Sequence, residues 1–165
     1  MIFVDGSSRG NPGPGGWAVV LVENGEVVET MGQQLPQVTN NQMELTAILE
    51  ALKKYGVDES EFFYPVLYSD SQYSVNVYTK WMFNWAANNW IKSDENIPLN
   101  LDTIKEFYDL WVNKGKRLDI RWVKGHSDSK GNNLADAIAT GKINLDKGLK
   151  GEKNEHIIKW IEGKY

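Results

Sequence analysis

The chain has 165 residues, 41% of them hydrophobic, which is enough for one domain with a sizeable core. It contains no cysteine, which excludes disulfides and thiolate metal sites and fits a reducing compartment, so we expect a cytoplasmic protein. No signal peptide is visible, and the longest apolar run, Trp17 to Val22, is too short to span a bilayer. The net charge is −4, so bulk charge does not attract a polyanion, and a nucleic-acid partner needs a local surface or bound cations.

The first third of the chain predicts three consecutive strands. An apolar strand at 2–4 runs into Asp5, and residues 6–16 then form a loop with five glycines and two prolines. Residues 17–35 predict a hairpin, because WAVVLV and EVVETMGQQL are strand-like and an Asn-Gly pair between them is a strong two-residue turn signal.

The rest of the chain alternates helices with strands. Thr39 and Gln42 match a capping box and Gly56 is a plausible stop, which predicts a helix over 40–55. Then follow a strand over 64–70, helices over 71–90 and 99–114, a strand over 118–125 and a helix over 131–143. This order predicts an α/β fold with a five-stranded mixed sheet, three antiparallel strands and then two parallel ones, flanked by helices.

Four acidic residues occupy unusual places in these elements. Asp5 and Asp70 each end a predicted strand, and ligands gather at the carboxyl ends of strands in open α/β sheets. Glu44 and Asp136 each share an otherwise apolar helix face, where an acid is costly unless it is paired or binds a metal. Singly, each residue has an ordinary explanation as a helix cap, a strand end or a partner of a helix dipole.

Convergence of all four acids on one sheet end indicates a metal site. Clustered carboxylates repel one another, and divalent cations remove that repulsion. Ligands that are all oxygen suit Mg²⁺ or Mn²⁺. Two such ions about 4 Å apart are the arrangement that drives in-line phosphodiester displacement.

Four motifs in order resemble type 1 ribonuclease H. They are DGSSRGNPGPGGW, TNNQMELTAILEAL, YSDSQYSVN and WVKGHSDSKGNNLADAIA. The resemblance covers about residues 2 to 143, so we expect the catalytic domain of the RNase H-like fold at 1–143. Together the motifs are specific, whereas a single DG or GH pair would mean little.

The resemblance implies an endoribonuclease that hydrolyses the RNA strand of RNA–DNA hybrids with two Mg²⁺ ions, for which Mn²⁺ substitutes. Its products carry 5′-phosphate and 3′-hydroxyl ends, and its substrates include R-loops and RNA primers. The family's four metal-binding acids correspond to Asp5, Glu44, Asp70 and Asp136. His126, in the loop KGHSDSKG, corresponds to a residue that assists proton transfer or product release, and the alternative is a surface-loop histidine.

The same resemblance implies a set of substrate contacts. Contacts across the minor groove fall to Asn11, Asn40, Asn41 and Gln72, with backbone or hydroxyl contacts from Gly6 and Ser7. Helix capping is the alternative role for Asn40 and Asn41. Thr39 and Asn100 match a pocket that grips a phosphate of the DNA strand, and Trp81 stacks on or abuts that strand.

The chain departs from the family in two segments. The handle, a protrusion at about 80–98 that is commonly basic, carries Ala86, Ala87, Asn88 and Asn89 where positive charges are common. Fewer phosphate contacts predict modest affinity with a shallow salt dependence. Residues 144–165 have no counterpart in the family, and a short helix at 156–161 is possible there.

Three other functions compete with a stand-alone, monomeric hybrid nuclease. A transposase-type DNA nuclease shares the fold and the clustered acids but usually lacks the Asn-Asn pair and the GH loop. A domain cut from a reverse transcriptase would show itself in the sequence before Met1. A binding module without catalysis has no use for four clustered carboxylates.

Overall fold

The sheet has five strands, as the sequence predicts, and the computed structural model describes residues 1–124 and 130–143. Its strands are β1 (Ile2–Ser8), β2 (Gly13–Glu23), β3 (Glu26–Val38), β5 (Val66–Ser69) and β7 (Asp119–Trp122), in the spatial order β3-β2-β1-β5-β7. β1, β2 and β3 pair antiparallel, and β5 runs parallel to both β1 and β7. The predicted mixed topology is confirmed.

The first strand does not end at the carboxylate, so that prediction is wrong. β1 continues through Asp5 to Ser8, and Gly6 pairs with Trp17 of β2. The glycine-rich segment is therefore largely strand, with the turn confined to 9–12, because the ladder with β2 outweighs the local preference for a loop. The parallel pairing of β1 with β5 does stop earlier, at Phe3, so Asp5 still lies beyond that end.

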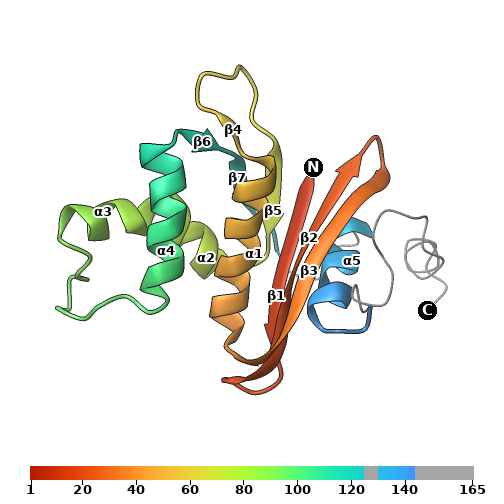
Figure 1. Ribbon diagram of the computed structural model, residues 1–165, viewed down its shortest axis with the longest axis horizontal. Coiled ribbons are helices and arrows are strands. Elements are labelled where there is room, and N and C mark those ends of the chain that lie inside the picture. The colour runs from red at the N-terminus through yellow and green to blue at the C-terminus, as the bar shows by residue number, and fades with distance from the viewer. Residues whose placement is uncertain (125–129, 144–165) are drawn as a thin grey trace.

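Helices α1 (Asn40–Tyr55), α2 (Gln72–Asn76), α3 (Met82–Ala87) and α4 (Leu101–Tyr108) belong to one side of the sheet (Figure 1). The predicted capping box at the start of α1 is present, and the Gly56 amide donates to the Leu52 carbonyl at its end. Both of the next predicted helices contain a π-helical segment, η1 (Val77–Trp81) before α3 and η2 (Asp109–Asn113) after α4.

The opposite side of the sheet is covered by α5 (Lys130–Ala139) (Figure 1). Its apolar residues pack with Phe3, Ala18 and Val20, which point away from α1 because strand side chains alternate. Gly131 lies so close to β1 that a Cβ there would fall 2.2 Å from the Phe3 ring. The sheet is thus held between two separate cores.

Sequence reasoning missed a small second sheet. β4 (Val57–Asp58) pairs with β6 (Lys116–Arg117), and two-residue strands are too short to show a periodic pattern. Among the residues that the structure describes, no helix is long and apolar enough to cross a membrane. The predicted helix at 156–161, and all of 144–165, lie outside the described residues.

Candidate metal centre

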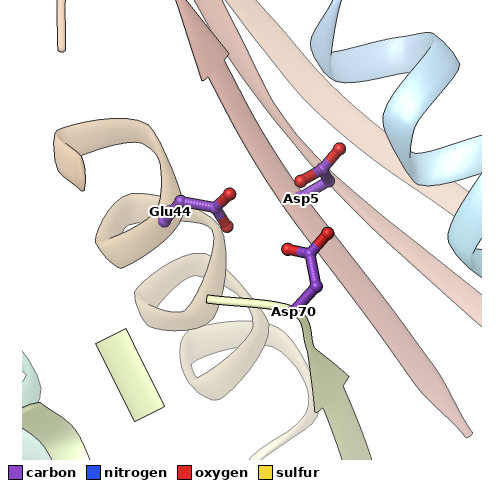
Figure 2. Close-up of side chains that lie close together, drawn as sticks. All are labelled: Asp5, Glu44 and Asp70. Atoms are coloured by element: carbon purple, nitrogen blue, oxygen red, sulfur yellow. The ribbon is translucent and has the colours of Figure 1, made fainter. Parts of the chain in front are cut away.

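Three of the four predicted acids meet at the end of the parallel part of the sheet. Asp5 comes from β1, Glu44 from the second turn of α1, and Asp70 from the residue after β5. One carboxylate oxygen from each lies within 4.8 Å of the other two. Figure 2 shows the three carboxyl groups turned toward one another, each from a different element.

The fourth acid, Asp136, is not a member of this group of three and interacts with Asp5 from the other side of the sheet. It lies on α5, is half-buried, and is close enough to Asp5 to share a side-chain hydrogen bond with it. The alternation of β1 explains the arrangement, since Asp5 points to the α5 side as Phe3 does.

The cluster is electrostatically unfavourable without a cation. Burial, then the charges of Asp70 and Asp136, raise the pKa of Asp5 to about 8. Burial also raises the pKa of Glu44 well above its usual range, with further contributions from the charges of Asp5 and Asp70. Oε2 of Glu44 is buried without a hydrogen-bond partner among the described residues. An unpaired buried carboxylate oxygen beside two other carboxylates fits a divalent cation.

A glycine allows this close approach. A Cβ on Gly6 would fall 2.2 Å from the backbone nitrogen of Glu44, so α1 can lie this near to β1 only where the side chain is absent. A backbone hydrogen bond from Gly6 lowers the pKa of both Asp5 and Glu44, although the burial and charge effects are larger.

The asparagines beside the cluster are joined to one another. The side-chain Oδ1 of Asn40 accepts from the backbone N–H of Ser8 at 2.7 Å. The backbone N–H of Asn40 donates to the side-chain Oδ1 of Asn11 at 3.2 Å. The capping alternative for Asn40 and Asn41 is not what the structure shows, because the Thr39 hydroxyl accepts from the Gln42 amide and caps α1. Ser8, which the sequence analysis did not single out, ties the β1–β2 turn to the start of α1.

Asn41 and Trp81 line one cavity of about 730 Å³ beside α1, the helix that carries Glu44. Tyr73, Trp85 and Leu99 also line it, and the Trp81 ring contacts the rings of Tyr73 and Trp85. Tyr73 and Leu99 were missed because an aromatic or aliphatic residue in a helical pattern is read as core.

The remaining predicted residues that the structure describes lie at the ends of elements. Gln72 begins α2, and Asn100 precedes α4 in the left-handed conformation with φ 60°. No hydrogen bond among the described residues joins Asn100 to Thr39. Ser7 lines a second cavity, of about 260 Å³, on the α5 side. His126 lies outside the described residues.

Comparison with known proteins identifies the family. The family model described as RNase H matches residues 1–144. A ribonuclease H of Thermoanaerobacter sp. (strain X514) is 41% identical over 145 residues, which are 86% of this chain and 88% of that protein. One similar solved structure is the crystal structure of LC9-RNase H1, a type 1 RNase H with the type 2 active-site motif. It superposes with a TM-score of 0.71 at 26% identity, and the match covers 96% of this chain and 78% of that one. LC11-RNase H1, solved in complex with an RNA/DNA hybrid, has a TM-score of 0.62 at 21% identity, covering 90% and 98%.

Proposed function

This chain belongs to the ribonuclease H family of nucleases, and from that membership we propose that it hydrolyses the RNA strand of RNA–DNA hybrids with two bound Mg²⁺ ions. The products are 5′-phosphate and 3′-hydroxyl ends, and the cellular substrates are R-loops and RNA primers. A relative solved with an RNA/DNA hybrid, LC11-RNase H1, supports the substrate class.

The ions are held by Asp5, Glu44, Asp70 and Asp136. The single observation that carries this assignment is the buried, unpartnered Oε2 of Glu44 inside a group of three carboxylates within 4.8 Å. Bound divalent cations supply an activated water and stabilise charge on the scissile phosphate and the leaving oxygen. Asp5 and Glu44, whose pKa values are raised, release their protons when they become ligands.

Recognition of the hybrid falls to the polar edge beside the acids. Asn11 lies in the β1–β2 turn, and Asn40 and Asn41 lie in the first turn of α1. Asn40 is hydrogen-bonded to Asn11 and to Ser8 of β1, the strand that carries Asp5. Amides suit a ribose 2′-hydroxyl because it both donates and accepts hydrogen bonds. Nδ2 of Asn11 has no partner among the described residues, so it is available to donate.

The DNA strand follows the cavity beside α1 and α3. Asn41 and Trp81 line it together, which supports the assignment of Trp81 to the DNA strand. Thr39 and Asn100 are proposed to hold a DNA phosphate, and Gly6, Ser7 and Gln72 to contact the hybrid near the acids. Residues 1–143 constitute the catalytic domain, in which His126 assists proton transfer or product release.

The decisive experiment compares four labelled substrates with Mg²⁺, with Mn²⁺ and with EDTA. The substrates are an RNA–DNA hybrid, single-stranded RNA, duplex RNA and duplex DNA. We expect cleavage of the RNA strand of the hybrid alone, abolished by Asp70→Asn and unchanged by Asp102→Asn. Asp102 is exposed on α4, so it controls for the same chemical change outside the cluster. Cleavage of duplex DNA instead would favour a transposase-type nuclease, and no cleavage with either ion would overturn the assignment of the acids.

A further inference from the structure

The C-terminal end of α5 is joined to the edge strand β3 through one side chain, that of Gln34. Its Nε2 amide donates to the carbonyl of Ile138 at 2.9 Å and to the carbonyl of Ala139 at 3.0 Å. The last four carbonyls of a helix lack partners within the helix, so donors from elsewhere must satisfy them. Gln34 therefore anchors the helix end to the sheet by hydrogen bonds as well as by packing.

The other carbonyls of this turn are satisfied by the chain that follows. Thr140 donates to the Asp136 carbonyl through its amide at 2.9 Å and its hydroxyl at 2.8 Å, and the Ile143 amide donates to the Ala137 carbonyl at 3.1 Å. The Ile138 carbonyl also accepts from the Gly141 amide at 3.1 Å. The Ala139 carbonyl accepts its hydrogen bond from the side chain of Gln34. Loss of the Gln34 amide thus removes these two hydrogen bonds and leaves the last turn held to the sheet by packing.

The sheet is shaped to admit this contact. Gln34 pairs with Gly16 of β2, and a Cβ on Gly16 would fall 2.2 Å from Nε2 of Gln34 and 2.8 Å from the Ala139 carbonyl oxygen. The amide therefore fills the space above Gly16 and touches the helix directly.

The anchored turn carries the fourth acid of the proposed metal centre, which interacts with Asp5 of β1. Asp136 lies within the last turn that Gln34 anchors. We propose that Gln34 is a positioning residue for Asp136, which holds that carboxylate within reach of the Asp5 side of the metal centre. This inference rests on the proposed role of Asp136 as a metal ligand.

The test measures metal binding and local opening without substrate. Gln34→Met keeps the length of the side chain and removes the donor, and Gln33→Met makes the same change at the next exposed position, on the other face of β3. Mn²⁺ binding is measured by calorimetry, and hydrogen exchange is followed at the amides of Thr140 and Gly141.

We expect Gln34→Met to raise the Kd for Mn²⁺ by about tenfold, at the low end of the cost of losing a group that orients a metal ligand. Exchange at the Thr140 and Gly141 amides rises in the same variant, and Gln33→Met leaves both quantities unchanged. Faster exchange with an unchanged Kd would overturn the inference and leave Gln34 as a support of the helix only, as would no change in either. If the wild type itself binds no Mn²⁺, the proposed metal centre fails rather than the role of Gln34.

Discussion

Removal of one clustered carboxylate should stabilise the metal-free protein, and the size of the effect follows from the geometry. One oxygen of Asp70 lies within 4.8 Å of an oxygen of Asp5 and of Glu44. At an effective dielectric constant near 20, two full charges at that distance repel by about 3.5 kcal/mol. Asp70 is partly exposed, so solvent reduces this value, and we expect Asp70→Asn to raise the free energy of unfolding by about 1–3 kcal/mol at pH 9.

The gain should shrink at low pH. The pKa of Asp5 is about 8, against a usual value of 3.8, so at pH 5 its carboxyl group is protonated in the folded protein and does not repel Asp70. Urea unfolding in EDTA at pH 5 and pH 9 measures both values. Asp102→Asn serves as the control, because its loss from the first turn of α4 changes only a helix-dipole interaction.

The wild type has a matching pH dependence. Between pH 4 and pH 8 the folded protein keeps a proton on Asp5 that the unfolded chain has already released, so the free energy of unfolding falls as pH rises. The loss from this residue is at most about 6 kcal/mol, because each unit of pKa difference corresponds to about 1.36 kcal/mol and water entering the site reduces the total. Equal stabilisation by Asp70→Asn at pH 5 and pH 9, or destabilisation at pH 9, would refute this account of the cluster.

Three further changes test the supports and the substrate surface. Gly6→Ala should lower the free energy of unfolding by about 3 kcal/mol in a urea titration, because the new Cβ meets the Glu44 backbone. Gly25→Ala should lower it by only about 1 kcal/mol, because Gly25 has φ 77° but open space around it. Thr39→Ala removes the cap of α1 and should cost about 1 kcal/mol in thermal or urea unfolding. The affinity of Asp70→Asn for a hybrid should fall only modestly between 50 and 200 mM salt, far less than the roughly thousandfold loss that six or more phosphate contacts produce. A thousandfold loss would contradict the prediction that the weakly basic handle makes few phosphate contacts.

The sheet order and the acids could be predicted because both leave periodic or positional signals. The Asn-Gly turn fixed the β2–β3 hairpin, and the structure gives Asn24 and Gly25 the positive φ values that such a turn requires. Glu44 was recognisable because an acid interrupts an apolar helix face with Ile48, Ala51 and Tyr55, of which Ile48 and Ala51 are buried and Tyr55 is half-buried. These signals are local, so a single sequence displays them.

The supports of the site could not be predicted, because they depend on contacts between residues far apart in the chain. The continuation of β1 beyond Asp5 depends on its ladder with β2, which outweighs the turn preference of the glycines. Ser8 holds Asn40 across 32 positions, and Gln34 holds Ala139 across 105. Neither serine nor glutamine in a strand signals such a contact, since both are usually solvated there.

The clustered acids of the proposed metal site lower the stability of the metal-free protein. Burial of Asp5 and Glu44 costs free energy in the metal-free chain, and packing on both sides of the sheet holds them in place regardless. A residue that only supports the fold lowers stability and activity together when it is replaced. Replacement of an acid in the cluster should instead raise the free energy of unfolding above pH 8 while it weakens metal binding. This opposite direction of the two effects identifies the residues of the site without reference to any relative. Gln34 differs from both classes as a positioning residue, because its replacement should loosen the end of α5 and also raise the Kd for Mn²⁺, whereas loosening alone would make it a support of the helix only.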